Sequence, residues 1–455
     1  PGSGIVYALT VSAAEDVAAS LREAGHRVQA YTGRTDPVDR ERLENSLRHN
    51  EVKALIATSA LGMGFDKPDL GFVVHLGAPA SPVAYYQQVG RAGRATERAD
   101  VLLLPGPEDA DIWRHFASVS MPREDQAAAV LATLAEASRP MSTAAIETAV
   151  DIRRTRLELL LKVLDVDGAV QRVTGGWLGT GQAWTYDAER YAWVARARAA
   201  EQDQMVTYER TSECRMAFLQ RTLDDESAAD CGRCDTCAGV WFPTDVPDRV
   251  IRSAEDRLAQ VGVAVDPRTM WPTGMDRLGV PLKGRIGPDV QAEPGRVIGR
   301  MSDLGWGSRL RQLLRQDAPV PAEVMDAVVR TLAAWRWVRR PTGVVAIPSR
   351  ARPELVGSLA EGIAGIGRLP LLGTLDLVDG GPTGEPGGNS AFRLAGVYGR
   401  FAVGPDLRER LAGHDGPVLL VDDVVDSRWT LTEATRTLRE AGADSVLPFA
   451  LAVEH

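Results

Sequence analysis

The sequence predicts a multidomain α/β protein in which two alternating strand and helix segments are separated by a helical module and a cysteine cluster. Its 455 residues exceed what one hydrophobic core usually supports, so several domains are expected. Short apolar runs alternate with helical patterns near both ends of the chain, which is typical of parallel sheets layered with helices. Hydrophobic and charged contents of 44% and 25% are ordinary for folded protein.

The composition also indicates the cellular location of the protein and the kinds of partner that it can bind. No stretch approaches the roughly 18 apolar residues of a membrane helix, and no charged start precedes an apolar run. We therefore expect a cytoplasmic protein with no membrane partner. The net charge of -9 argues against a uniformly basic nucleic-acid binder, although it leaves room for local basic faces.

The first domain is predicted at residues 4–119. Apolar runs predict strands at residues 4–9, 28–31, 52–58, 72–76 and 101–104. Helical patterns predict helices at residues 12–24, 36–47 and 81–89. This order predicts a parallel sheet whose loops at the strand ends bind ligands.

Two of those loops carry the strongest motifs. Residues 58–68 (Thr-Ser-Ala-Leu-Gly-Met-Gly-Phe-Asp-Lys-Pro) follow a strand, and their glycines let backbone amides approach a phosphate-bearing ligand. Residues 85–94 (Tyr-Tyr-Gln-Gln-Val-Gly-Arg-Ala-Gly-Arg) place two arginines three residues apart, and paired guanidiniums fit the spread charge of a phosphoryl-transfer transition state. The alternative is a surface loop with two solvated arginines. Both motifs lie at the ends of successive strands, which favours function.

The segment at residues 57–95 resembles motifs V and VI of the RecQ family of DNA helicases, and residues 4–50 are similar to motif IV of the same RecA-like lobe. The resemblance implies that Thr58, Gly62 and Gly64 contact the DNA backbone or couple it to nucleotide. It implies that Asp66 faces the nucleotide, and that the ATP site is completed by Gln87, Arg91 and Arg94. It also implies ATP with Mg²⁺ as cofactors, single-stranded or tailed duplex DNA as partner, 3' to 5' movement in replication or repair, and association with a bacterial nucleoid.

One part of such a motor is absent from the sequence. There is no Gly-x-x-x-x-Gly-Lys-Ser/Thr, and none of the four lysines (53, 67, 162 and 283) follows a glycine-rich loop. We therefore expect that this chain does not hydrolyse ATP alone, and that the intact protein does so with a first helicase lobe as partner.

A winged helix is predicted at residues 120–195. Helices at residues 126–136, 142–150 and 152–166 precede two strands, at 170–173 and 183–186, which flank a glycine-rich tip bearing Trp177. The third helix is the expected groove-binding element, and its candidate DNA-contacting residues are Arg153, Arg154 and Arg156. The alternative is a small helical connector with solvated arginines.

A zinc-binding subdomain is predicted at residues 196–244. Cys214 precedes the knuckle Cys231-Gly-Arg-Cys234-Asp-Thr-Cys237, and four thiolates form a closed tetrahedral Zn²⁺ site without a position for substrate. The site is therefore expected to be structural, with two disulfides as the alternative. RecQ helicases carry a similar subdomain, which reinforces zinc. Their winged helix follows the zinc subdomain, however, whereas the candidate here precedes it, so a duplex-splitting hairpin is in doubt.

A second alternating segment is predicted at residues 340–455, after a helical and irregular connector at 245–339. An apolar strand from residue 418 ends in two carboxylates and leads into a helix with hydroxyl residues at its start, an arrangement suited to a ribose phosphate. The residues concerned are Asp422, Asp423, Asp426, Ser427 and Thr430.

This segment resembles type I phosphoribosyltransferases, most closely the ComF branch, with residues 380–388 as the mobile loop and 349–352 as the pyrophosphate loop. The resemblance implies a phosphoribosyl ligand. Arg428 stands where the family has glycine, so an inherited fold is favoured over retained transfer activity. An alternative to the helicase hypothesis is therefore a phosphoribosyl-binding enzyme or sensor whose helicase half is vestigial.

Overall fold

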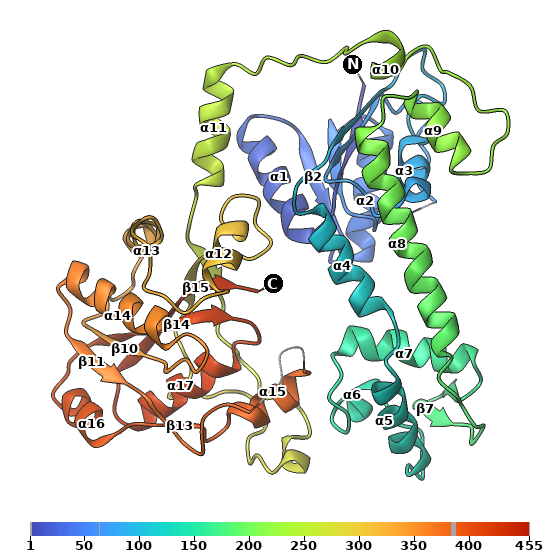
Figure 1. Cartoon of the computed structure of the whole chain (residues 1–455). Coiled ribbons are helices and arrows are strands. Elements are labelled where there is room, and N and C mark those ends of the chain that lie inside the picture. The colour runs from blue at the N-terminus through green and yellow to red at the C-terminus, as the bar shows by residue number, and fades with distance from the viewer. Residues whose placement is uncertain (1, 63, 384–387, 455) are drawn as a thin grey trace. The chain divides into compact units, whose positions relative to one another are not determined.

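The computed structural model describes residues 2–62, 64–383 and 388–454 (Figure 1). The chain divides into two units, the first formed by residues 1–121 and 185–247 and the second by residues 122–184 and 248–455. In the part of the chain that the structure describes, no helix is both long and apolar enough to cross a bilayer.

A parallel sheet lies at the centre of the first unit. Across the described residues it has five strands in the order β2-β3-β1-β4-β5. They are β1 (Gly4–Ala8), β2 (Val28–Tyr31), β3 (Ala54–Ala57), β4 (Phe72–Leu76) and β5 (Asp100–Leu104). Successive residues of β1 enter opposite cores, Ile5 and Tyr7 on one face and Val6 and Ala8 on the other. These strands confirm the predicted α/β lobe.

Helices cover this sheet. They are α1 (Val11–Glu23), α2 (Pro37–Arg48), α3 (Pro82–Val89), α4 (Asp109–Ser120), α8 (Ala188–Arg210), α9 (Arg215–Arg221) and α10 (Asp235–Ala238). The first three match the predicted helices, whereas α4 and α8 were not predicted. Helix α8 buries Met205 and Tyr208 in the same core as Tyr7. The predicted boundary at 195/196 therefore falls inside a continuous helix that packs on the first lobe.

A three-helix module opens the second unit. Its elements are α5 (Glu124–Ala135), α6 (Thr143–Glu147), α7 (Arg154–Val166), β6 (Val170–Val173) and β7 (Gly176–Gly179). The second hairpin strand was predicted at 183–186, but β6 pairs with β7, inside the expected glycine-rich tip. The positive φ angles of Gly175 and Gly176 allow that tight turn. Trp177 is 7% exposed in the module core, so its prediction as a wing tip is wrong.

The C-terminal domain is built on a second sheet. Within the described residues its order is β11-β10-β14-β15-β9-β8, parallel except for β8 against β9. The strands are β8 (Val263–Val265), β9 (Gly295–Arg300), β10 (Gly343–Ala346), β11 (Leu371–Thr374), β14 (Pro417–Val425) and β15 (Ser445–Val453), and β12 (Asp376–Leu377) pairs separately with β13 (Phe401–Ala402). Because β8 and β9 belong to this sheet, the predicted connector at 245–339 is not a separate element.

The helices of this domain complete its layers. They are α11 (Asp248–Leu258), η1 (Met275–Leu278), α12 (Gly307–Leu313), α13 (Ala322–Ala334), α14 (Pro353–Gly367), α15 (Ser390–Val397), α16 (Pro405–Ala412) and α17 (Trp429–Glu440). Alternate residues of β14 enter two cores, Leu419 and Val421 in one and Val418 and Leu420 in the other. This double burial explains why the strand appears in the sequence as an unbroken apolar run.

Candidate functional site

The two motif loops of the first unit meet through Arg91. Its Nη1 donates to the Phe65 carbonyl at 2.9 Å and its Nη2 to the Gly62 carbonyl at 3.0 Å, and the residue is only 8% exposed. Thr58, at the start of the same loop, is buried and its amide donates to the Tyr31 carbonyl at 3.2 Å. The guanidinium of Arg91 therefore holds the shape of the loop after β3.

Arg94 occupies a different environment. Its side chain is 55% exposed, and its Nη1 lies 3.0 Å from Oδ1 of Asp66, which is 58% exposed. Gln87 on α3 and the backbone of Gly62 and Gly64 are also exposed. The predicted ligand-facing residues thus form two groups. Arg91 is hydrogen-bonded to carbonyls of the loop, whereas Arg94, Asp66 and Gln87 face solvent.

A buried histidine behind these loops was not predicted. The His75 ring on β4 stacks on Tyr7 and also contacts Tyr85, and its Nε2 lies 2.7 Å from Oε1 of Gln88. Burial lowers the pKa of His75 to about 4. Gln88 is the neighbour of the predicted Gln87, so α3 presents one amide to the core and the next to solvent. No sequence signal marked His75, because a lone histidine in an apolar strand has no characteristic spacing.

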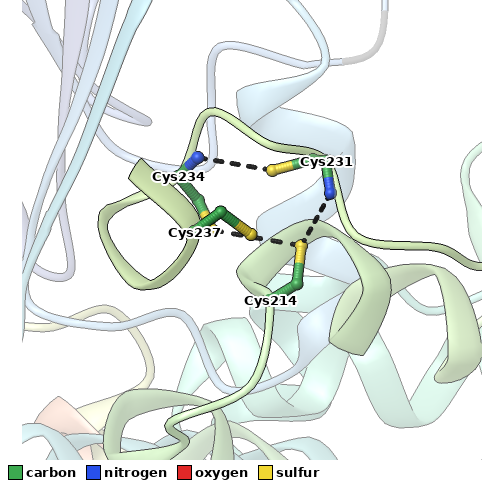
Figure 2. A group of neighbouring side chains, drawn as sticks. All are labelled: Cys214, Cys231, Cys234 and Cys237. Carbon is green, nitrogen blue, oxygen red and sulfur yellow. Dashed lines mark hydrogen bonds between the residues drawn. The ribbon is translucent and has the colours of Figure 1, made fainter. Parts of the chain in front are cut away.

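The four cysteines converge as predicted (Figure 2). Their sulfur atoms all lie within 4.8 Å of one another, and the Cys214 and Cys234 sulfurs are 3.9 Å apart. A tetrahedron with metal–sulfur bonds of about 2.3 Å has edges of about 3.8 Å, so the cluster fits a metal ion. Backbone amides of Cys231 and Cys234 donate to the sulfurs of Cys214 and Cys231 at 3.2 and 3.3 Å. Such bonds stabilise thiolates, the form that binds metal.

Packing fixes the orientation of the cysteine cluster. Cys214 caps the start of α9 rather than lying on the preceding helix, and its sulfur also accepts from the Ala217 amide. Arg215 binds both carboxylate oxygens of Asp235 at 3.1 Å, and this pair joins the helix to the knuckle. The cluster therefore connects α9 and α10.

The arginines predicted to contact DNA from α7 are engaged within the protein. Arg153 lies 3.4 Å from Asp426, and Arg154 pairs with Glu158 at 3.1 Å and Glu147 at 3.6 Å. Burial lowers the pKa of Arg156, with the charge of Arg123 as a smaller cause. Arg153 and Arg156 are half-buried and Arg154 is exposed, and contact of these arginines with DNA stays a prediction.

The predicted phosphoribosyl residues gather at the end of β14. Asp422 and Asp423 are each 5% exposed and lie within the strand rather than at its tip. Burial, and then the charge of Asp423, raise the pKa of Asp422 well above its usual range. Asp423 accepts from Ser349 Oγ and Arg352 Nε, both at 2.9 Å. One of the two carboxylates is thus already paired with an arginine of this domain.

The loop after these carboxylates departs further from expectation. Asp426 lies 2.5 Å from Arg393, and the Ser427 carbonyl accepts two bonds from Arg268 at 3.1 and 2.8 Å. Arg428 adopts a left-handed φ of 68° before α17, a conformation that favours glycine. Thr430 is half-buried in the first turn of α17. The predicted mobile loop lies partly at residues 384–387, outside the described residues.

Comparison with known proteins identifies the class of the first lobe. Residues 1–96 match the model of the helicase conserved C-terminal domain. The solved C-terminal domain of the DEAD-box protein Dbp5 is 26% identical and covers 26% of this chain and 71% of that domain, with a TM-score of 0.22.

Two similar proteins are ATP-dependent DNA helicases. ATP-dependent DNA helicase Q1 of Rattus norvegicus is 40% identical over 119 residues, which are 26% of this chain and 19% of the relative. ATP-dependent DNA helicase RecQ of Pasteurella multocida is 37% identical over 124 residues, 27% of this chain and 20% of the relative. The chain thus spans about a fifth of the length of these relatives, and its match to the helicase conserved C-terminal domain covers residues 1–96.

Proposed function

We propose that this chain contributes the second motor lobe and a DNA-docking region to an ATP-dependent 3' to 5' DNA helicase that acts in replication or repair, on the cytoplasmic bacterial nucleoid. The observation that carries this proposal is the meeting of the two motif loops through Arg91, with Arg94 exposed beside Asp66. An exposed arginine next to a loop that a buried guanidinium holds in place is suited to a phosphate that arrives from a facing lobe.

The remaining parts of the active site would come from the first lobe. It would supply the phosphate-binding loop and its lysine, and Mg²⁺ would neutralise charge on the phosphates. The residues of this chain would then orient the nucleotide through Asp66 and Gln87 and neutralise charge through Arg94. The cysteine cluster would hold Zn²⁺ as a structural ion, which stabilises α9 and α10 on the motor lobe.

DNA binding by this chain is tested by fluorescence anisotropy with labelled single-stranded and tailed duplex DNA at low and moderate salt. We expect binding that weakens steeply with salt, because phosphate contacts release counterions. No binding at low salt would overturn independent DNA docking by this chain.

The motor assignment is tested in the protein that contains both lobes. Arg94→Gln should abolish ATP-dependent unwinding of tailed duplexes and leave DNA binding intact. Arg98→Gln is the matched control, since Arg98 is also an exposed arginine paired with a carboxylate, that of Asp100. Equal unwinding by the two variants would contradict the role of Arg94.

A second candidate function is binding of a phosphoribosyl ligand by the C-terminal domain. The observation that favours it is the buried carboxylate pair at the end of β14, because Arg352 pairs with Asp423 while a second buried acid, Asp422, lies beside it, and adjacent buried acids are costly. Thermal unfolding with phosphoribosyl diphosphate and Mg²⁺ tests it. Stabilisation that Asp422→Asn removes would support this function, and no stabilisation at millimolar ligand would exclude it.

A further inference from the structure

Within the second unit, the turn between α6 and α7 contacts the first turn of α15. Asn389 is 2% exposed, and its Nδ2 donates to the carbonyls of Glu147 and Val150 at 2.6 and 2.7 Å. Its backbone amide donates to Oδ1 of Asp151 at 2.7 Å. We call residues 147–153 the docking turn. It carries the last residue of α6 and the N-cap of α7.

The side chain of Asn389 serves both sides of this contact. Its Oδ1 accepts from the amides of Ala391 and Phe392 at 3.0 and 3.1 Å and so caps α15. Both ends of the amide are therefore bonded, which is characteristic of a specific buried contact. Gly388 allows the close approach, because a Cβ at this position would lie 2.7 Å from the Asp151 carboxylate.

Two further contacts join the same surfaces. Asp426 lies between two arginines, Arg153 of the docking turn at 3.4 Å and Arg393 of α15 at 2.5 Å. Arg277 donates to Thr148 Oγ1 at 3.2 Å. A neutral amide, a shared carboxylate and the guanidinium of Arg277 thus bind the turn at separate points.

The contact covers the part of the module that matters for DNA. In helix-turn-helix proteins the N-terminal residues of the third helix approach the base edges, and here that position is Arg153. We propose that the C-terminal domain docks on residues 147–153 and masks Arg153, the N-cap of α7, from duplex DNA by pairing it with Asp426, so that Arg153 reaches duplex DNA only after undocking. This inference rests on the proposed DNA-binding function.

Asn389→Asp in the full chain tests the masking. The aspartate keeps an oxygen to cap α15, but it replaces the amide donor with a carboxylate that faces two carbonyls and the Asp151 carboxylate. Ser142→Asp is the matched control, because it adds the same charge at another helix cap, that of α6, whose Ser142 Oγ accepts from the Ala145 amide. Hydrogen exchange of residues 147–153 and anisotropy with blunt duplex DNA are measured for both variants.

We expect faster exchange of the docking turn in Asn389→Asp, and duplex binding tighter than that of the control by on the order of tenfold, since two buried hydrogen bonds are lost. Exchange equal to that of the control would overturn docking. Faster exchange without tighter duplex binding would overturn masking. In either case the proposed DNA-binding function is judged separately, from the binding of tailed DNA by the unmodified chain.

Discussion

Replacing Arg91 by glutamine removes the guanidinium that ties the loop after β3 to the end of α3. Two charge-assisted hydrogen bonds are lost, to the carbonyls of Phe65 and Gly62 at 2.9 and 3.0 Å. Bonds of this kind contribute about 1.5 kcal/mol each or more, so the loop should lose about 3 kcal/mol, on the order of a hundredfold in its closing equilibrium.

Arg94→Gln is the matched control for this change. It removes a second guanidinium three residues away, but the ion pair with Asp66 is exposed on both sides and should contribute at most about 1 kcal/mol. Loss of ATPase activity does not separate the two variants, because both arginines belong to the same proposed site. Hydrogen exchange does, since the Phe65 amide donates to the Gly62 carbonyl inside the loop.

The expected result is exchange of the Phe65 amide on the order of a hundredfold faster in Arg91→Gln and only a few-fold faster in Arg94→Gln. Equal exchange in the two variants would refute the assignment of Arg91 as the residue that holds the loop. It would return both arginines to the role of ligand contacts.

Three other predictions concern separate parts of the chain. Metal analysis should find one zinc ion per chain. Cys214→Ser should lose this zinc and also the protection of the cysteine cluster against hydrogen exchange. Full protection in the absence of metal would contradict a structural role for zinc. Burial lowers the pKa of His75 from 6.5 to about 4. Between these two pH values the unfolded chain binds one more proton than the folded chain. The free energy of unfolding of the first unit should therefore fall by up to about 3 kcal/mol as pH falls from 6.5 to 4. Hydrogen exchange of the first unit, measured from pH 6.5 to pH 4, checks this prediction, and His75→Gln should weaken the pH dependence of its stability. Asp423→Asn should lower the free energy of unfolding of the C-terminal domain by about 2 kcal/mol, because Arg352 loses its buried carboxylate partner. Asp379→Asn is the control, because the Asp379 carboxylate is exposed in its ion pair with Arg400, and this change should have little effect.

Errors of prediction cluster where packing overrides local pattern. The glycine-rich stretch around Trp177 was predicted as a loop tip because glycine is uncommon in strands, yet the buried indole fixes β7 there. Helix α8 was missed because its few buried residues, Met205 and Tyr208, lie near one end of a mostly polar helix. Strands β8 and β9 were missed because they are separated by irregular, proline-rich sequence, and only their pairing with β15 and each other makes them strands.

Local pattern was enough for features whose cause is local. Alternating apolar runs and helix caps predicted the strands and the first three helices of the first unit, because burial of one face imposes a period on the sequence. Cysteine spacing predicted the cysteine cluster, because four soft ligands that could hold one ion must lie within reach of one another. The environment of each polar group, however, depends on partners distant in sequence. Arg91 and Arg94 are the same residue type in the same motif. In the structure, however, Arg91 is buried and bonded to two carbonyls, whereas Arg94 faces solvent. Asn389 carries no sequence signal for the carbonyls 239 and 242 residues away that it binds, because burial and hydrogen bonding are set by which surfaces the fold brings together.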